Sequence, residues 1–414
     1  MPGLLNTLLI EGTFEELAEE FAAYLDNLQK AQGNESSNIS SEVAGLLPDG
    51  NHDNVLKKLV GGADILNTAP EKEFIPAYTQ LLHLVRQSEN IQMFLHRICQ
   101  HLSKPIVSSP ANSAGLALSV LSTVFNILEP DDETRYNILL AVIAVVRQSS
   151  NFDNLIPQLK HLDTWIAEWE LDSEDQRKLF LAITDTATTA GESETAYQYL
   201  VRALRTIPSE EVSTKEAADL SLRALKSALI HPSHFDFQDL TALDSIQALR
   251  KSNPVYFELL EIFSTEGLDE FNDFKDEHEG WLEKEEFDDQ ALNRKMRLLT
   301  LTSMAASASQ ARQLPYAEIA TRLRVPREEV EMWVIDVIRA GLVEGKLSQL
   351  NQMFLIHRST YRVFGEKEWR EVASRLDLWR TSLVGVLGVV RQAKEERIRE
   401  LEQEVNGNRG AVGA

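Results

Sequence analysis

The residues best suited to metal chemistry are His96, Cys99 and His101, which lie within six positions of one another. A tetrahedral zinc site needs a second Cys or His pair to complete it, and no such pair closes the site. His231 and His234 are expected in a loop between helices. We therefore interpret the first three residues as helix residues, with Cys99 a small core group, and we predict neither a metal nor another cofactor.

Patterns typical of catalysis are missing from the sequence. Gly365-Glu366-Lys367 lacks the flanking glycines and the hydroxyl residue of a phosphate-binding loop. No Gly-x-Ser-x-Gly occurs, and no His-x-His precedes an Asp as a zinc isopeptidase requires. Paired acids such as Asp288-Asp289 are best explained as solvated helix ends. We predict that the chain is not an enzyme.

Size and composition are those of a soluble globular protein. The 414 residues are 43% hydrophobic and 25% charged, enough for two or three structural units. The longest apolar run, Ile138 to Val146, is nine residues, whereas a membrane span needs about 20. The first basic residue is Lys30, so the apolar start lacks the basic flank of a signal peptide. A single cysteine favours a reducing compartment, so the residues alone predict a cytoplasmic or nuclear protein with no membrane partner; of the two we favour the cytoplasm.

The net charge of −23 is unevenly distributed along the chain. Residues 291–414 carry 20 Lys and Arg against 15 Asp and Glu, a net +5, so the remainder carries −28. An acidic body repels nucleic-acid phosphates. Only the C-terminal part is suited to RNA, although an ordinary solvated surface explains its charge more simply. Its possible RNA-facing residues are Arg358, Arg362, Lys367, Arg370 and Arg375.

Helix signals dominate the first 310 residues. Thr13 and Glu16 form a capping box, and Phe14, Leu17, Phe21 and Leu25 follow at helical spacing. Further helices are expected at about 71–87, 90–102, 112–129 and 132–149. Residues 32–54 are rich in Gly, Ser and Asn and are expected to form a mobile loop. Successive helices joined by short breaks predict an α-solenoid of helical repeats.

Residues 311–365 predict a winged helix. After a helix over 288–310, Ile319 and Leu323 mark a short helix, and Pro326 suits the first turn of the next. Buried positions recur at Val330, Val334, Val337 and Ile338, Gly341 ends the helix, and two short β-like runs surround the polar turn 348–352. The second helix opens with Arg327-Glu328-Glu329 and adds Glu331. Carboxylates there are unsuited to reading DNA, so we predict protein pairing rather than specific DNA binding.

The C-terminal helix carries a regular apolar seam. Its members are spaced 3, 4, 3, 4, 3 and 4 residues apart, which calls for another helix alongside. They are Trp369, Val372, Leu376, Trp379, Leu383, Val386 and Val390, and Ile398, Leu401 and Val405 continue the seam after a four-residue slip. We expect Trp369 to Trp379 to pack on the chain's own winged-helix domain. From Leu383 onward the seam extends beyond any core the chain easily supplies.

Helical repeats that lead into a winged helix and a long helix resemble the PCI domain family. This family contributes subunits to the proteasome lid, the COP9 signalosome and eukaryotic translation initiation factor 3. The likeness runs through most of the chain and is densest over residues 290–380, whereas the 32–54 loop and the tail after Arg391 depart from it. The residues that carry it are Trp165-Ile166, Trp169, Leu171, Lys295-Met296-Arg297-Leu298-Leu299-Thr300, Val330-Glu331, Val334-Ile335-Asp336-Val337-Ile338-Arg339, His357-Arg358-Ser359-Thr360, Arg362, Phe364-Gly365 and Trp369.

The resemblance implies a fold and a domain plan. The fold is all-α with a small β-hairpin: an α-solenoid, then a winged helix, then a long C-terminal helix. We expect N-terminal repeats over 1–204, a PCI domain over 205–378, a bundle helix over 366–405 and a disordered tail over 406–414.

The resemblance favours a non-catalytic scaffold subunit of initiation factor 3. That complex binds the small ribosomal subunit and promotes recruitment of mRNA and initiator tRNA. The partners implied are its other PCI and MPN subunits, and the ribosomal subunit through the complex. Val343, Leu347, Met353 and Leu355 are expected to pair with a neighbouring PCI subunit, since exposed strand edges invite pairing. The residues expected in a shared helical bundle are Leu383, Val386, Val390, Ile398 and Leu401.

Two alternatives stay open from the sequence. One is a PCI subunit of the COP9 signalosome or the proteasome lid, which shares the architecture. The other is direct RNA contact through the five basic residues named above.

Overall fold

The computed structural model describes residues 12–33, 38–49, 52–88, 90–308, 311–363 and 365–411. Its contacts divide the chain into two compact units. Unit 1 comprises the chain up to residue 234 together with 239–258, and unit 2 comprises 235–238 together with the chain from residue 259. One boundary falls between residues 234 and 235, and the other two fall within α13 (Gln238–Thr241) and α15 (Pro254–Thr265). Among the described residues, no helix combines the length and the apolar character of a membrane span.

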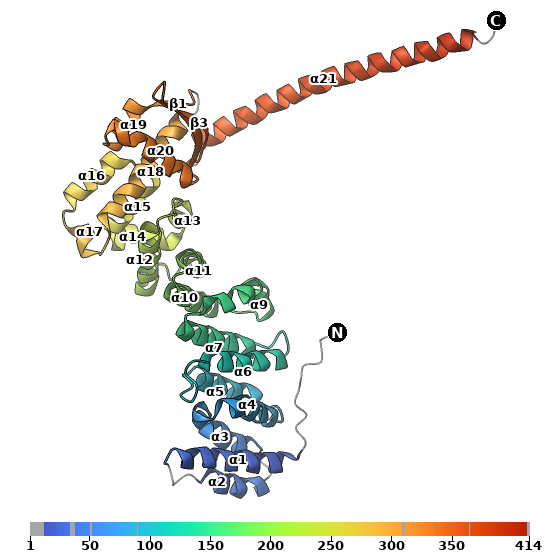
Figure 1. Cartoon of the computed structure of the whole chain (residues 1–414), viewed down its shortest axis with the longest axis vertical. Helices are drawn as coiled ribbons and strands as arrows, with labels where there is room; N and C mark the ends of the chain where they lie inside the picture. Colours follow the sequence, from blue (N-terminus) through green and yellow to red (C-terminus); the bar gives the residue numbers. More distant parts are fainter. Residues whose placement is uncertain are drawn as a thin grey trace. The chain divides into compact units, whose positions relative to one another are not determined.

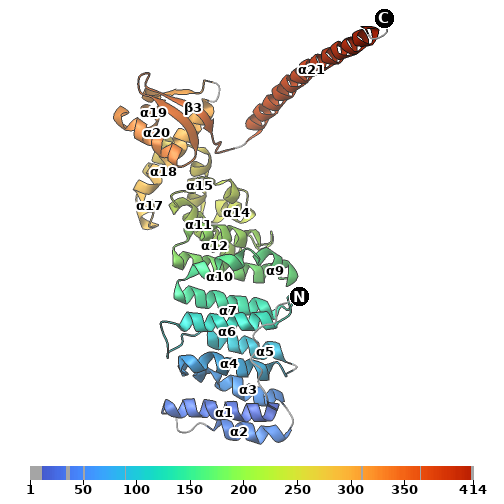
Figure 2. The same cartoon turned by 45° about the vertical axis from the view of Figure 1, so that its right-hand side comes forward.

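Unit 1 is a stack of α-helices in successive layers, as Figures 1 and 2 show. The expected α-solenoid is therefore confirmed. The predicted domain boundary at 204–205 falls at the end of its α11. The helices are α1 (Phe14–Ala31), α2 (Ile39–Leu46), α3 (His52–Gly62), α4 (Glu71–Val85), α5 (Ile91–Leu102), α6 (Ser113–Ile127), α7 (Thr134–Ser149), α8 (Ile156–Leu159), α9 (Leu162–Glu168), α10 (Ser173–Ala190), α11 (Ser193–Arg205), α12 (Lys215–Ile230), α13 and α14 (Asp244–Ser252), with 3-10 turns at Leu47–Asp49, Ala63–Thr68 and Phe152–Asn154.

The first helix begins where the sequence predicts. The Thr13 hydroxyl accepts from the Glu16 amide at 3.4 Å, and the Glu16 carboxylate accepts from the Thr13 amide at 3.1 Å. This capping box satisfies two backbone donors that the first turn of a helix leaves without partners. The predicted stripe is buried along α1, with Phe21 and Leu25 fully inaccessible. Local sequence and packing therefore agree in this segment.

A buried carboxylate orders the segment that the sequence predicts to be a loop. Asp26, on the buried face of α1, accepts from the amides of Ile39 and Ser40 at 3.0 and 2.9 Å and from the Ser40 hydroxyl at 2.5 Å. It thereby caps the N-terminus of α2 from another helix, where Asn38 makes no side-chain cap. The expectation of a mobile loop over 32–54 is wrong for residues 39–49 and 52–54, which are helical. Residues 34–37 and 50–51 lie outside the described part.

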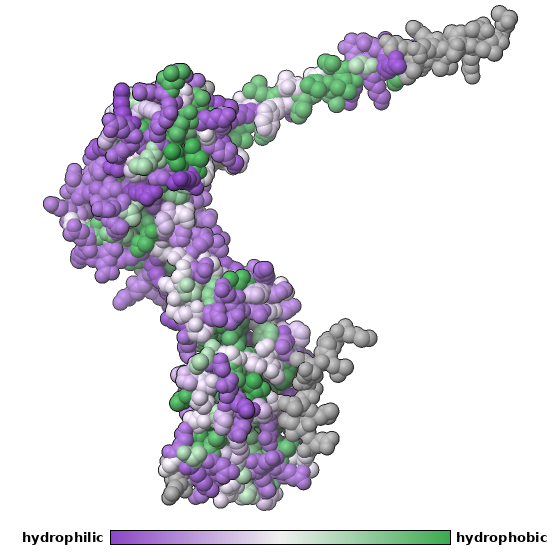
Figure 3. Space-filling view, in the orientation of Figure 1, coloured by the Kyte–Doolittle hydropathy of each residue, from purple (hydrophilic) through white to green (hydrophobic). Residues whose placement is uncertain are grey.

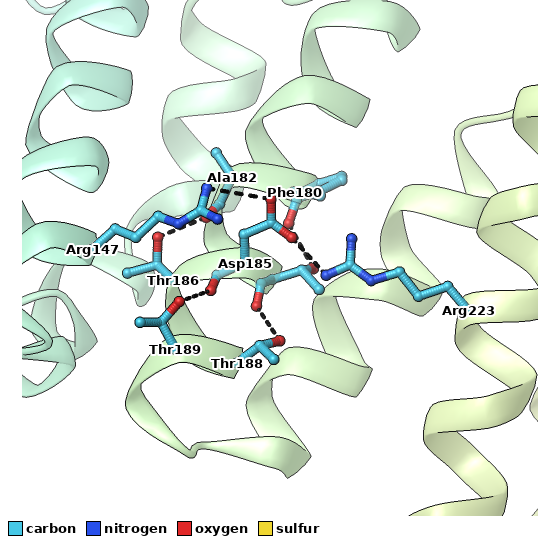
Figure 4. Close-up of polar contacts among 9 residues, drawn as sticks. Arg147, Phe180, Ala182, Asp185, Thr186, Thr188, Thr189 and Arg223 are labelled. Carbon is cyan, nitrogen blue, oxygen red and sulfur yellow. Dashed lines mark hydrogen bonds and ion pairs between the residues drawn. The ribbon is translucent and has the colours of Figure 1, made fainter. Parts of the chain in front are cut away.

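Ion pairs also connect successive helices farther along unit 1. Asp185 of α10 accepts from Arg147 of α7 at 3.5 Å and from Arg223 of α12 at 2.5 Å (Figure 4). Threonines of α10 donate hydroxyl hydrogen bonds to the carbonyl oxygens four residues earlier, as Thr186 does to Ala182. Their side chains are thereby satisfied within the helix. Since all three charged side chains are a third to a half exposed, the pairs contribute little stability and act mainly to hold the layers in register.

Unit 2 contains the predicted winged helix. Its elements after α15 are α16 (Leu268–Glu277), α17 (Trp281–Lys284), α18 (Asp289–Ser307), β1 (Gln313–Pro315), α19 (Tyr316–Leu323), a 3-10 turn (Arg327–Glu329), α20 (Val330–Arg339), β2 (Val343–Ser348), β3 (Met353–Ser359) and α21 (Glu366–Ala411). Helix, turn, helix and hairpin occur in the expected order, so this part of the prediction is confirmed. Buried residues of α18, α19, α20 and the strands form one core around Phe354.

The sheet has three strands rather than the two of the expected hairpin. The order is β1-β3-β2, antiparallel throughout. Leu314 pairs with Phe354 on one side, and Leu347 pairs with Phe354 on the other. At Gly345 a Cβ would overlap the Leu355 carbonyl oxygen and the Phe354 ring, so only glycine fits this position. β1 is not predictable from the sequence, because a three-residue strand is too short to show an alternating pattern.

The C-terminal helix α21 starts at Glu366, as expected, but runs through Ala411. The expected end at 405 and the disordered tail are therefore wrong for residues 406–411, which continue the helix. Residues 412–414 lie outside the described part.

Replacing Asp26 by Ala is expected to loosen α2. The change removes the acceptor for two backbone amides and a hydroxyl, and hydrogen bonds to a charged group are worth about 1.5–3 kcal/mol each in favourable cases. We expect unit 1 to lose about 2–3 kcal/mol in urea unfolding, with faster hydrogen exchange over residues 39–46. Glu19→Ala, an exposed acid of the same helix, is the control. Unchanged exchange in Asp26→Ala would show that α2 does not depend on this cap.

Candidate functional site

The edge of β2 is the first candidate interaction surface. β2 ends the strand order, so its outer backbone groups are not paired within the described sheet. The side chain of Val343 is buried in the winged-helix core, and that of Leu347 is half-buried. Glu344 and Lys346 are exposed between them. Any pairing along β2 would therefore use backbone groups and these polar side chains rather than Val343.

The other two residues predicted for strand pairing lie elsewhere. Met353 and Leu355 belong to β3, the central strand, whose backbone pairs with β1 on one side and β2 on the other. The expectation that they form a free edge is wrong, because the unforeseen strand β1 occupies it. Both side chains are half-buried.

The apolar surface of α21 is the second and larger candidate. Leu383 is 68% exposed, and Val386, Val390 and Ile398 are also exposed. Figure 3 shows hydrophobic residues along this helix. The side chain of Leu401 lies outside the described part. These side chains are where a partner helix would have to pack, as the heptad spacing predicts.

The expectation that Trp369 to Trp379 pack on the chain's own domain is wrong. Trp369 is 63% and Trp379 69% exposed, and only Val372 is half-buried. The winged-helix core is closed by α18, α19, α20 and the sheet without them. The described seam from Leu376 onward is therefore exposed.

Apolar residues of α21 extend beyond the predicted seam. Leu378, Val384, Leu387 and Val389 are also exposed. Thr381 to Val390 are ten consecutive residues without a charge, so this stretch is uncharged around its full circumference. A helix that is apolar all round is normally buried on all sides. Heptad spacing does not identify this second set, because its members lie outside the 3-4 repeat.

Arg362, predicted as a possible RNA contact, has a structural role. Its guanidinium donates to the carbonyl oxygens of Phe263 and Glu266 at 2.6 Å each and more weakly to that of Ile262 at 3.3 Å. It also contacts the Ser303 hydroxyl at 3.2 Å. The three carbonyls lie at the C-terminal end of α15, where a helix leaves carbonyls without intrahelical partners and a positive charge is favoured, whereas Ser303 belongs to α18. Burial lowers the pKa of Arg362 to about 10, so it stays charged at neutral pH.

Two of the remaining predicted RNA-facing residues pair with carboxylates of the chain. Arg358 pairs with Glu344 across the β2–β3 strands at 3.4 Å, and Arg370 pairs with Glu366 one turn back at 2.5 Å. Arg375 is exposed on α21, and the side chain of Lys367 lies outside the described part. Three of the five predicted residues, Arg358, Arg362 and Arg370, thus make polar contacts within the chain.

The candidate metal ligands do not converge. His96 is exposed beside Gln100, while His101 is buried and contacts the Asp64 carboxylate at 3.1 Å. Cys99 faces the core, and burial raises the pKa of its thiol to about 12. The sequence interpretation of these residues as parts of a packed helix agrees with this arrangement.

Two family models match the C-terminal part of the chain. The model described as "PCI domain" matches residues 275–358, which include α18, the winged helix and its sheet. The model described as "eIF3 subunit M, C-terminal helix" matches residues 362–390. The second match covers Arg362 and the apolar seam of α21 from Trp369 to Val390.

Known relatives match the chain along almost its whole length. A protein named eukaryotic translation initiation factor 3 subunit M from Phaeosphaeria nodorum is 64% identical, over 98% of this chain and 93% of its own length. Proteins of the same name from Neosartorya fischeri and Aspergillus clavatus are each 54% identical over 97% of this chain and 90% and 88% of their own lengths.

Replacing Arg362 by Ala is expected to destabilise unit 2 by about 2–3 kcal/mol, since several α15 carbonyls lose a charged donor at once. Urea unfolding and hydrogen exchange at the end of α15 measure the effect. Arg358→Ala, in which an exposed pair is lost, should cost less than about 1 kcal/mol. A variant at Arg362 that keeps full stability but loses RNA affinity would contradict the structural role.

The Cys99 thiol is expected to resist thiol reagents in the native protein. A pKa of about 12 leaves almost no thiolate at pH 8, and the side chain is buried. In a titration with a chromogenic disulfide reagent, the single thiol should react only after denaturant is added. Rapid stoichiometric reaction without denaturant would contradict the packing around α5.

Proposed function

The chain belongs to the family of eukaryotic translation initiation factor 3 subunit M, and we propose that it acts in that complex as a non-catalytic scaffold subunit. The observation that carries the proposal is the exposed apolar length of α21. A soluble chain that displays these side chains in water gains most by packing them against other helices. Its role is therefore to join subunits.

The helix contribution to assembly is large enough to matter. Leu383, Val386, Val390 and Ile398 are each worth about 1.5–3 kcal/mol when fully buried. Their heptad spacing suits another helix rather than a flat surface. The uncharged circumference from Thr381 to Val390 supports a position inside a bundle of helices.

The winged helix supplies a second means of association. The outer edge of β2 offers backbone donors and acceptors to a strand of a neighbouring PCI subunit. Backbone pairing tolerates different partner sequences, whereas Glu344 and Lys346 would set which strand is preferred. The acids that open α20 argue against DNA as the partner.

The activity of the whole complex comes from its other parts as well as from this chain. As a member of this family, the protein would work in the cytoplasm with PCI and MPN subunits. The assembled factor would bind the small ribosomal subunit and promote mRNA and initiator tRNA recruitment. This chain's part is to hold subunits in place, and no reaction is assigned to it.

The double variant Leu383→Asp with Val390→Asp is expected to leave the complex. Two buried carboxylates on the seam would cost several kcal/mol, whereas the free helix would still fold. Circular dichroism of the isolated chain should be unchanged, and pull-down should recover less than about a tenth of the normal amount of partner subunits.

The matched control places the same two charges on the opposite side of α21. Ser374→Asp with Gln392→Asp lies half a turn from the seam and outside the segment Thr381–Val390. It should co-purify with the partners at the normal yield. Normal recovery of the seam variant would refute the bundle assignment, and equal loss of both variants would refute the assignment to the seam.

A further inference from the structure

The solvent-facing side of α20 carries exposed apolar residues that the proposed function does not use. Met332 is 62% and Ile335 41% exposed, three residues apart on one side of the helix. Glu328, in the 3-10 turn four positions before Met332, and Arg339, one turn after Ile335, flank these residues and are also exposed. In a DNA-binding winged helix this side of the helix would face the groove. Single exposed apolar residues are ordinary, so their grouping and surroundings matter.

Contacts on both flanks join this side of α20 to neighbouring elements. On one flank, Asp336 pairs with Arg294 of α18 at 2.8 Å, and Arg297 of α18 lies over the Trp333 ring at 5.3 Å.

On the other flank, the Glu331 carboxylate accepts from the Gln349 amide at 2.8 Å. This bond holds the β2–β3 turn against the first turn of α20. The next residue of that turn, Leu350, is 95% exposed. We call Met332, Ile335 and Leu350, with the charged residues around them, the α20 face.

The α20 face has the anatomy of a protein interface. Its centre is apolar and its rim is polar and charged, as in protein–protein contacts. Its charges also differ between the two ends: Glu328 and Glu329, beside the single base Arg327, precede α20, and Arg339 ends it. Exposed carboxylates at the start would repel nucleic-acid phosphates.

We propose that the α20 face binds an α-helix of a partner protein that runs antiparallel to α20. Apolar residues three apart, flanked by charges one turn away on either side, match the spacing of a facing helix rather than a strand. Helices favour acids at their start and bases at their end. An antiparallel partner therefore brings its basic end to Glu328 and Glu329 and its acidic start to Arg339.

The orientation has a measurable consequence. Arg339 lies eleven positions after Glu328, about 16 Å at 1.5 Å per position. The partner segment thus needs about three turns. This site is separate from the β2 edge and from α21, so it stands or falls independently of the bundle assignment.

Photo-crosslinking in the assembled native complex tests the proposal. Benzoylphenylalanine is placed at Met332 in one sample and at Arg339 in another, within the full chain purified from cells with its partners. Both probes should reach the same partner protein. The residue reached from position 339 should precede the one reached from position 332 by about seven positions. A probe at Thr321, exposed on α19, should not reach that segment.

Other outcomes overturn the proposal. Crosslinks to RNA, to a second copy of this chain, to two different proteins, or in the parallel order each do so. The same holds if neither probe reaches any partner.

A second measurement uses charge and apolar variants with the probe at position 339. Met332→Asp with Ile335→Asp should lower the crosslinked yield about tenfold, since central apolar anchors dominate interface energies. Ile230→Asp, 58% exposed on α12, should leave the yield unchanged. Where circular dichroism shows that the first variant misfolds, Glu328→Lys with Glu329→Lys replaces it and should lower the yield several-fold. Unchanged yield in a folded variant overturns the proposal.

Discussion

A helix that lies in water needs charged groups around its surface, and the middle of α21 has none. From Thr381 to Val390 every residue is uncharged and exposed. No rearrangement of side chains on one helix removes ten such residues from water, so their burial requires other helices. The winged helix closes its own core without the described apolar side chains of this stretch, and the core of the N-terminal helices is likewise built from its own residues.

The sequence predicts those parts of the fold in which local pattern and packing agree. The capping box at Thr13, the helical stripe that follows it and the order of the winged helix depend on residues close together in the chain, so spacing alone finds them. α2 is different, because its N-terminal cap is Asp26, thirteen residues away on another helix. β1 is too short for any periodicity, and its partner Leu355 is 42 positions later. Contacts between residues this far apart in the chain leave no pattern in a short stretch of sequence.

Candidate site residues were harder to predict than the fold. Basic residues near a C-terminus look alike in a sequence, but Arg362 serves the end of a helix about 100 residues earlier, whereas Arg370 pairs one turn away. The seam of α21 was predictable because heptad spacing is a strong signal. How much of the seam is exposed was not predictable from spacing. Whether Trp369 and Trp379 pack on the domain depends on whether other residues already fill the winged-helix core. Phe354 and its neighbours fill it.

The exposed length of α21 also bears on how cells keep this protein. A newly synthesised copy that is not yet assembled with partners exposes hydrophobic surface of the kind that chaperones and proteases recognise. Supply in excess of the partners would be removed rather than stored. Under the proposed scaffold role, the amount of the protein in a cell would then follow the amount of its partner subunits.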